Sequence, residues 1–145
     1  MPIVVRRLGP EDAAVAARLF VLMAETFDEP RAPVSHDYIA RLLASEAVWV
    51  IAAFSGDEVV GGLTAHALPM TRAETTELFV YDVAVHPAHQ RRGIGRALFK
   101  ALRVLAGTAG IEGTFVAADN EDSHALDFYR AIGGSPGPVT IFTFE

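Results

Sequence analysis

The segment that decides the fold runs from Val80 to Ala106 and reads VYDVAVHPAHQRRGIGRALFKALRVLA. It begins with the alternating apolar residues that are typical of a strand. It ends with apolar residues at the spacing of one helical face, namely Ala97, Leu98, Ala101, Leu102 and Leu105. Between the two lies QRRGIG, which brings glycines and arginines to the point where the helix starts. The segment therefore predicts a strand, a tight loop and a helix.

The loop Gln90–Gly95 has the chemistry of an anion site. The first N–H groups of a helix have no partner within the helix, and they carry partial positive charge. The arginines of the run and Arg96 add full charges, while the glycines permit a close approach to the backbone. We expect a phosphate or pyrophosphate site, with a solvated glycine-containing loop as the alternative. The GKS/T ending of a nucleotide-triphosphate loop and the three-glycine spacing of a dinucleotide fold are both missing.

Composition limits the class of protein. The length of 145 residues suggests a single domain over residues 1–145. The chain has no cysteine, which excludes disulfides, a thiol nucleophile and thiolate metal sites. It has neither a signal-peptide pattern nor an apolar run long enough to span a membrane, so we expect a cytoplasmic protein with no membrane partner. A net charge of −6 disfavours a nucleic-acid partner and suits a cationic substrate, although ordinary solubility also explains it.

The rest of the chain mixes strand and helix patterns along one expected sheet. Strands are expected at 3–8, 47–54, 59–68, 75–85, 113–118 and 139–145. Helices are expected at 9–27, 35–45, 95–106 and 123–132. Ser35 suits the N-cap of the second helix, and Gly133 suits the end of the last. This mixture indicates an α/β or α+β class.

The sequence resembles the GCN5-related N-acetyltransferases. Their signature, Gln/Arg-x-x-Gly-x-Gly/Ala, is matched by Gln90, Gly93 and Gly95, and a second element is matched by ALDFYRAIG. The resemblance implies a mixed, mostly antiparallel twisted sheet of roughly six to seven strands flanked by about four helices. It also implies a splayed slot for acetyl-CoA, the co-substrate, between the fourth and fifth strands.

The resemblance assigns two stretches to acetyl-CoA. The pyrophosphate would bind beside Gln90 on the backbone of the loop, formed by Arg91, Arg92, Gly93, Ile94, Gly95 and Arg96. The pantetheine arm would pair like an extra strand with Val83, Ala84 and Val85. The family often has an asparagine at the position of Asp122.

Within that family the chain is similar to the aminoglycoside 3-N-acetyltransferases of type I, from about Leu8 to Phe144. The similarity rests on Tyr81-Asp82, on Glu77, and on the acidic segment with Asp119 and Asp122. It implies acetylation of the 3-amino group of an aminoglycoside and makes Glu77, Tyr81, Asp119 and Asp122 candidates for substrate binding. An aminoglycoside carries several ammonium groups, so its site needs several carboxylates. Glu121 also lies near the predicted slot. A second set of acids, Glu25, Asp28 and Glu29, follows the first helix, where acceptor loops of this fold commonly lie, with a solvated helix end as the alternative.

Two candidates for catalysis follow from the chemistry of amine attack on a thioester. The resemblance implies a backbone N–H near Val83 as the donor to the oxyanion, and Tyr129 as the general acid toward sulfur, protonated because its ordinary pKa is about 10. Asp82 is the candidate to receive or relay the amine proton. Tyr129 as a core aromatic and Asp82 as a solvent-facing strand residue are the alternatives.

Strand geometry raises a problem for these assignments. Alternation places Glu77 and Tyr81 on one face and Asp82 on the other. Both acids reach one site only if the strand carries a bulge, as the family typically does, or if they contact different parts of the ligand.

Other interpretations remain open. The acceptor could be another amine (a polyamine, a small metabolite or a protein N-terminus), or the chain could bind CoA without turnover. His86, His89 and the other histidines lack metal-ligand spacing, so no metal is expected. The resemblance also implies a homodimer, for which the apolar end VTIFTFE offers an edge.

Overall fold

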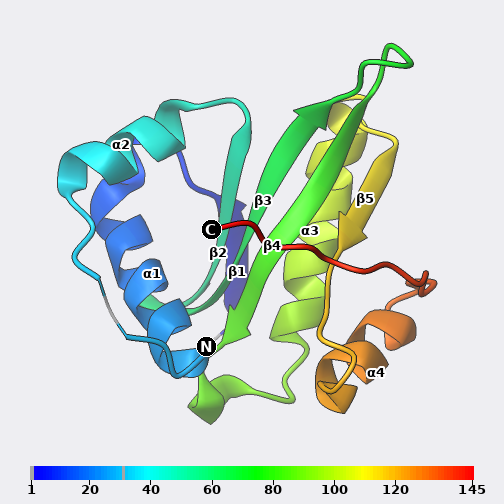
Figure 1. Ribbon diagram of the computed structural model, residues 1–145. Helices are drawn as coiled ribbons and strands as arrows, with labels where there is room; N and C mark the ends of the chain where they lie inside the picture. Colours follow the sequence, from blue (N-terminus) through cyan, green and yellow to red (C-terminus); the bar gives the residue numbers. More distant parts are fainter. Residues whose placement is uncertain (1, 31) are drawn as a thin grey trace.

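The computed structural model describes residues 2–30 and 32–145. Within them five strands form one sheet in the order β1-β2-β3-β4-β5 (Figure 1). The strands are β1 (Ile3–Arg7), β2 (Val48–Ser55), β3 (Glu58–Pro69), β4 (Thr76–Val85) and β5 (Gly113–Val116). Neighbours from β1 to β4 pair antiparallel, whereas β5 pairs parallel to β4. The parallel pair requires a crossover, which a helix supplies.

Helices cover both faces of the sheet. They are α1 (Ala13–Thr26), α2 (His36–Ala44), α3 (Ile94–Thr108) and α4 (Ser123–Ala131), with short 3-10 turns η1 (Pro10–Asp12) and η2 (Pro87–His89). The helices α1 and α2 bury one face around Leu19 and Val50, and α3 buries the other around Leu98 and Ile51. The rings of α4 pack on the core of α3. These layers confirm the predicted α/β class and the order of elements.

One predicted strand is wrong. Residues 139–145 form no strand, so the described residues hold five strands rather than the six to seven of the expected sheet. The apolar pattern of this tail is real, but a strand also needs a neighbour to receive its N–H and C=O groups. Within one chain the tail runs clear of the sheet, with Val139, Ile141, Phe142 and Phe144 between 75% and 92% exposed.

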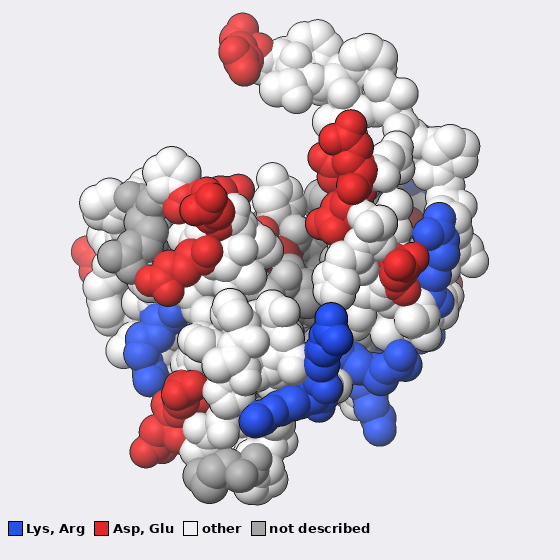
Figure 2. Space-filling view, turned by 90° about the horizontal axis from the view of Figure 1, so that it is seen from below, with Lys and Arg blue, Asp and Glu red and all other residues white. Residues whose placement is uncertain are grey.

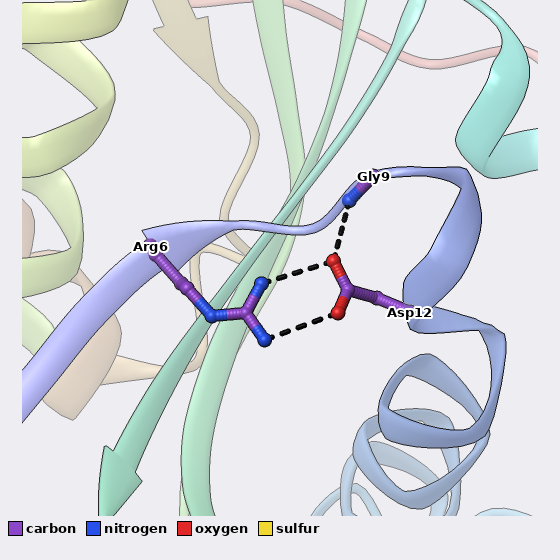
Figure 3. Close-up of polar contacts among 3 residues, drawn as sticks. All are labelled: Arg6, Gly9 and Asp12. Carbon is purple, nitrogen blue, oxygen red and sulfur yellow. Dashed lines mark hydrogen bonds and ion pairs between the residues drawn. The ribbon is translucent and has the colours of Figure 1, made fainter.

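The first helix is tied to the first strand by one carboxylate (Figure 3). The oxygens of Asp12 accept hydrogen bonds from both terminal nitrogens of Arg6, at 2.9 and 3.1 Å, and from the N–H of Gly9 at 2.8 Å. The guanidinium of Arg6 is the main cause that holds the pKa of Asp12 below its ordinary value. The clamp fixes how α1 leaves β1, and α1 covers the sheet beside β4.

Removing this carboxylate should destabilise the chain. We expect Asp12→Ala to lower the free energy of unfolding by about 1–2 kcal/mol. The substitution removes both the acceptor for the N–H of Gly9 at the start of the helix and the bidentate partner of Arg6. Urea unfolding at neutral pH measures the change. Glu74→Ala, which removes an exposed carboxylate from the β3–β4 loop, is the matched control and should change little.

The clamp also has a pH signature. Since the pKa of Asp12 is lowered in the folded state, its contribution is present at neutral pH and is lost as the pH falls below about 4, through that lowered pKa. The difference in unfolding free energy between the chain and Asp12→Asn should therefore shrink on acidification. A difference that stayed constant down to acid unfolding would contradict the role of the clamp.

Candidate functional site

A gap opens between β4 and β5. Their pairing runs from Glu77↔Gly113 to Val80↔Val116 and ends there, whereas β4 continues to Val85. The second half of β4 is therefore free of β5 on one flank. This is the splayed arrangement expected between the fourth and fifth strands.

Backbone groups of β4 face this gap. The N–H of His86 donates to Val60 of β3, at 2.8 Å. Because consecutive residues of a strand direct their N–H and C=O groups to opposite flanks, Val83 and Val85 direct theirs toward the gap. The carbonyl of Val85 accordingly accepts a hydrogen bond from outside β3, from Gln90 Nε2 at 3.1 Å. The backbone N–H and C=O of Ala84 are directed to β3, and its side chain is buried. Ala84 therefore presents no group to the gap.

A bulge in β4 resolves the conflict between the two acids. Thr64 pairs with Asp82 and the next residue, Ala65, pairs with Val80, so Tyr81 is the extra residue on the bulged strand. Before the bulge Leu78 and Val80 lie in the core under α3. After it, Val83 and Val85 pack on that same core. The alternation has shifted by one residue, and Asp82 now shares the opposite face with Glu77.

Asp82 is held on that face by a neighbour. The hydroxyl of Thr64, itself buried, donates to Asp82 Oδ2 at 2.9 Å. Their pairing partners on β3, Leu68 and Thr64, are four residues apart, so the two acids are separated by about 13 Å of strand at roughly 3.3 Å per residue. Glu77 and Asp82 can therefore contact different parts of one elongated ligand.

Aromatic rings line the same face between the acids. Tyr81 is 64% exposed and contacts His66 and Phe79 edge-on, with ring centroids 6.0 and 5.6 Å apart. Phe79 stacks on Phe115 of β5 at 4.7 Å with the planes almost parallel. We call His66, Phe79, Tyr81 and Phe115 the aromatic platform. The sequence analysis identifies only Tyr81 among these four residues. The alternation that places Phe79 on the same face as Tyr81 could also have indicated Phe79.

The loop before α3 is shaped for an anion. Arg91 and Gly93 both have positive φ, 66° and 78°, and Gly93 is the N-cap of α3. Turns with residues in the left-handed region can direct successive N–H groups to one side and so make a concave anion site. The first intrahelical bond is donated by Ala97 to Gly93, so the preceding N–H groups of α3 are directed outward.

Charge gathers at this end of the molecule. Arg91, Arg92 and Arg96 are exposed around the loop. Figure 2 views the molecule from below and shows a group of lysine and arginine side chains on this end, with acidic groups on both sides of a hollow above it. The loop therefore fits a pyrophosphate, through backbone N–H groups and arginine side chains. Gln90 instead ties the loop to β4, and the Ile94 side chain is buried in the core, so only its backbone faces the site.

The second glycine of the loop has a packing reason. A Cβ on Gly95 would lie 3.1 Å from the ring of Phe128. Phe128 and Tyr129 both contact Phe99 of α3, at 5.9 and 5.8 Å. Gly95 thus lets α4, which carries Tyr129, approach α3 closely.

Tyr129 is half-buried and electrostatically linked to the acids. Burial is the main cause that raises the pKa of Tyr129, and the negative charges of Asp122 and Asp82 raise it further. The phenol is therefore protonated at neutral pH. Its ring also packs on the core, so the structural and the catalytic interpretations both fit this position.

The turn before α4 carries the remaining predicted acids. Asp119 Oδ1 accepts from the N–H of Glu121 at 2.8 Å, and Asp122 Oδ1 accepts from the N–H of Ala125 at 3.0 Å. Asp122 therefore caps α4, which is a role that an asparagine also performs. Both side chains are exposed at this turn, beyond the end of β5.

His86 and His89 serve local structure. His86 Nδ1 accepts from the N–H of Ala88 at 3.0 Å, and His89 Nε2 lies 3.3 Å from Glu58 Oε1. Among residues 2–30 and 32–145, no cluster of three or more metal-ligating side chains is found. Nor does any helix in the same residues have the length and apolar character needed to cross a bilayer.

The sequence that forms the gap and the loop matches a known family. The family model described as acetyltransferase (GNAT) family matches residues 16–133. The chain belongs to the GNAT family. GNAT acetyltransferases use acetyl-CoA, and the free flank of β4 together with the loop before α3 fits that co-substrate.

The relatives of this chain include two kinds of acetyltransferase. The N-alpha-acetyltransferase RimI of Mycobacterium tuberculosis (strain ATCC 25618 / H37Rv) is 34% identical over 87% of this chain and 76% of its own. The crystal structure of an aminoglycoside acetyltransferase, HMB0005, from an uncultured soil metagenomic sample is 33% identical. It has a TM-score of 0.95 over 100% of this chain and 99% of its own. Another, meta-AAC0020 from such a sample, was solved with sisomicin; it is 29% identical, with a TM-score of 0.95 over 99% and 95% of the two chains.

The packing role of Gly95 can be measured against a glycine in the same helix. A Cβ on Gly107 would meet no atom within 4 Å, so Gly107→Ala should stabilise the chain by about 0.5–1 kcal/mol through helix propensity. In Gly95→Ala the contact of the added methyl group with Phe128 should offset this gain. We therefore expect Gly95→Ala to be less stable than Gly107→Ala by about 1 kcal/mol. Thermal unfolding compares them, and equal stabilisation by both would contradict the assignment.

Proposed function

We propose that the protein transfers the acetyl group of acetyl-CoA directly to the 3-amino group of an aminoglycoside. The observation that carries this proposal is the bulge at Tyr81, which brings Asp82, Glu77 and the aromatic platform to one face beside the gap. The similarity to aminoglycoside acetyltransferases over the full chain supports it.

The donor would be bound by backbone more than by side chains. Val83 and Val85 offer the strand flank that the pantetheine amides pair with, and the loop from Gln90 to Arg96 receives the pyrophosphate. Acetyl-CoA, when bound there, supplies an activated acetyl group. A thioester carbonyl near Val83 would receive a hydrogen bond from its N–H, which stabilises negative charge as the amine attacks.

Two side chains would manage the protons. The acceptor ammonium must lose a proton before attack, and Asp82 binds the cation and relays that proton through water. Tyr129 donates a proton toward the departing sulfur, and its raised pKa keeps the phenol protonated throughout the neutral range. The hydrogen bond from Thr64 orients Asp82 for this role.

The acceptor surface suits a ligand with several positive charges. Asp82 and Glu77 lie at the two ends of the aromatic platform, and Asp119 and Asp122 stand at the turn beyond β5. Carboxylates distributed in this way can pair several ammonium groups of one ligand, while the exposed ring of Tyr81 packs on the apolar face of a sugar ring. A ligand with one ammonium group would leave most of these carboxylates without a charged partner.

A second candidate is acetylation of a protein N-terminus. Its support is the relative RimI, at 34% identity over 128 residues. The donor half of the site is the same for both acceptors, so the acceptor half must distinguish them. A polyamine acceptor and binding of CoA without turnover are the further alternatives.

The release of CoA thiol from acetyl-CoA tests the proposal directly. With gentamicin, kanamycin, spermidine and an N-terminal peptide as acceptors, we expect the highest kcat/KM with an aminoglycoside. Mass and NMR analysis of the product then locate the acetylated amine. Turnover with the peptide alone would replace the proposal by its second candidate, and CoA binding without turnover on any amine would leave only a binding function.

Variants of the two proton-handling residues separate their roles. We expect Asp82→Asn to lower kcat/KM by about 10²-fold or more, and Tyr129→Phe to lower kcat by about 10–100-fold with a smaller effect on KM. Asp37→Asn and Tyr38→Phe, both exposed on α2, are the matched controls and should retain activity. Because the pKa of Tyr129 is raised above its ordinary value of about 10, no loss of rate from this group is expected up to about pH 9.

A further inference from the structure

His66 of β3 lies midway between the two acids of the proposed acceptor face. It pairs with Phe79 of β4, and the residues two positions before and after it on β3 pair with Asp82 and Glu77. Alternate residues of a strand share a face, and opposed residues of an antiparallel pair share that face as well. The imidazole of His66 therefore lies on the same face as both carboxylates, roughly 6–7 Å of strand from the level of each.

The nitrogens of this imidazole are available to a ligand. Among residues 2–30 and 32–145 neither ring nitrogen of His66 has a hydrogen bond or an ion pair, and neither is fully buried. The ring instead contacts Tyr81 edge-on, with the centroids 6.0 Å apart and an interplanar angle of 84°. On the other side its opposed residue on β2 is Val48, whose side chain is apolar. The ring is thus packed through its carbon atoms, while its polar atoms have no partner in the sheet.

The hydrogen-bonding character of an imidazole selects among ligand groups. A neutral imidazole offers one N–H donor and one accepting nitrogen. A hydroxyl group of a ligand also donates and accepts, so it can pair with either nitrogen. An ammonium group only donates, so it can pair with the accepting nitrogen alone, and a carboxylate is its stronger partner. His66 therefore matches the hydroxyl groups of a ligand, whereas Asp82 and Glu77 match its charges.

We propose that His66 is a specificity residue: it hydrogen-bonds a hydroxyl group of the acceptor and thereby favours a polyhydroxylated amine over a bare polyamine. This role rests on the proposed function, because it concerns the same acceptor face. The carboxylates of Asp82 and Glu77 attract both classes of ligand, since both carry several ammonium groups. His66 distinguishes the two classes, because the methylene groups of a polyamine take water from the imidazole without replacing its hydrogen bonds.

This role concerns binding of the acceptor and not the transfer of protons. A hydrogen bond to a hydroxyl group that takes no part in the reaction is equally strong before and during amine attack. Its loss should therefore raise KM for the acceptor and leave kcat unchanged. Loss of a proton donor such as Tyr129 is expected to lower kcat instead. The separation of KM from kcat thus distinguishes the proposed role of His66 from a role in the chemical step.

Acceptor kinetics of His66→Phe give the first test. Phenylalanine retains an edge contact with Tyr81 but removes both nitrogens. We expect KM for kanamycin to rise by about 3–10-fold with kcat unchanged. The affinity for spermidine, measured as an acceptor or as a competitive inhibitor, should stay within about twofold. His66→Gln, which keeps a donor and an acceptor, should recover part of the affinity for kanamycin. His36→Phe, exposed at the start of α2, is the matched control and should change neither value. Equal losses for kanamycin and spermidine, or a fall in kcat alone, would overturn the proposal.

Kanamycin analogues that each lack one hydroxyl group locate the contact. The effect of His66→Phe should vanish for the analogue without the contacted hydroxyl group and persist for the others, as in a double-mutant cycle. A loss of the same size for every analogue would assign His66 to packing alone. That result would overturn the role of His66 and leave aminoglycoside acetylation standing. If the native chain acetylates no aminoglycoside, the proposed function fails, and the role of His66 fails with it.

Discussion

The extra residue that Tyr81 inserts into β4 is the constraint on which the site depends. A strand sends alternate side chains to opposite faces, so without the bulge Asp82 would point into the core under α3. That core contains Leu98 and Leu102, both fully buried, and a carboxylate there would carry a large desolvation cost. With the bulge, β4 buries even-numbered residues before Tyr81, namely Leu78 and Val80, and turns odd-numbered residues, Val83 and Val85, to the same core after it. The strand therefore supports one continuous core and still presents two acids on the opposite face.

Under the proposed function, the two halves of β4 serve the donor and the acceptor separately. Up to Val80 the strand is paired on both flanks, and its outward side chains share a face with Phe115 of β5. Beyond Val80 one flank is free, and the strand leads directly into the loop before α3. The bulge lies at the boundary between these two halves. An amine bound on the proposed acceptor face would lie next to the end of the gap, where we propose that the N–H of Val83 donates to the thioester carbonyl.

Local features are predictable from the sequence and long-range ones are not. Ser35 caps α2, Gly93 takes the left-handed conformation before α3, and most elements begin within a few residues of the expected positions, because these features depend on neighbours along the chain. The contact of Phe79 with Phe115 joins strands that are far apart in sequence, and the contact of Tyr81 with His66 depends on the register of β3 against β4, so no local pattern indicates either of them. The prediction of a strand for the tail fails for a related reason: its alternation is local information, but a strand exists only where another strand receives it.

The acceptor half is where members of this family must differ. In the proposed function the free flank of β4 and the N-terminus of α3 bind the amides and the pyrophosphate of acetyl-CoA, and these groups are the same whichever amine is acetylated. The acceptor face instead combines aromatic rings with carboxylates placed well apart, at Glu77, at Asp82 and at the turn around Asp122. A peptide N-terminus brings one ammonium group, whereas an aminoglycoside brings several at separations set by its rings. Because each carboxylate that loses water without gaining a charged partner costs free energy, this spacing supports our proposal of a ligand with several charges.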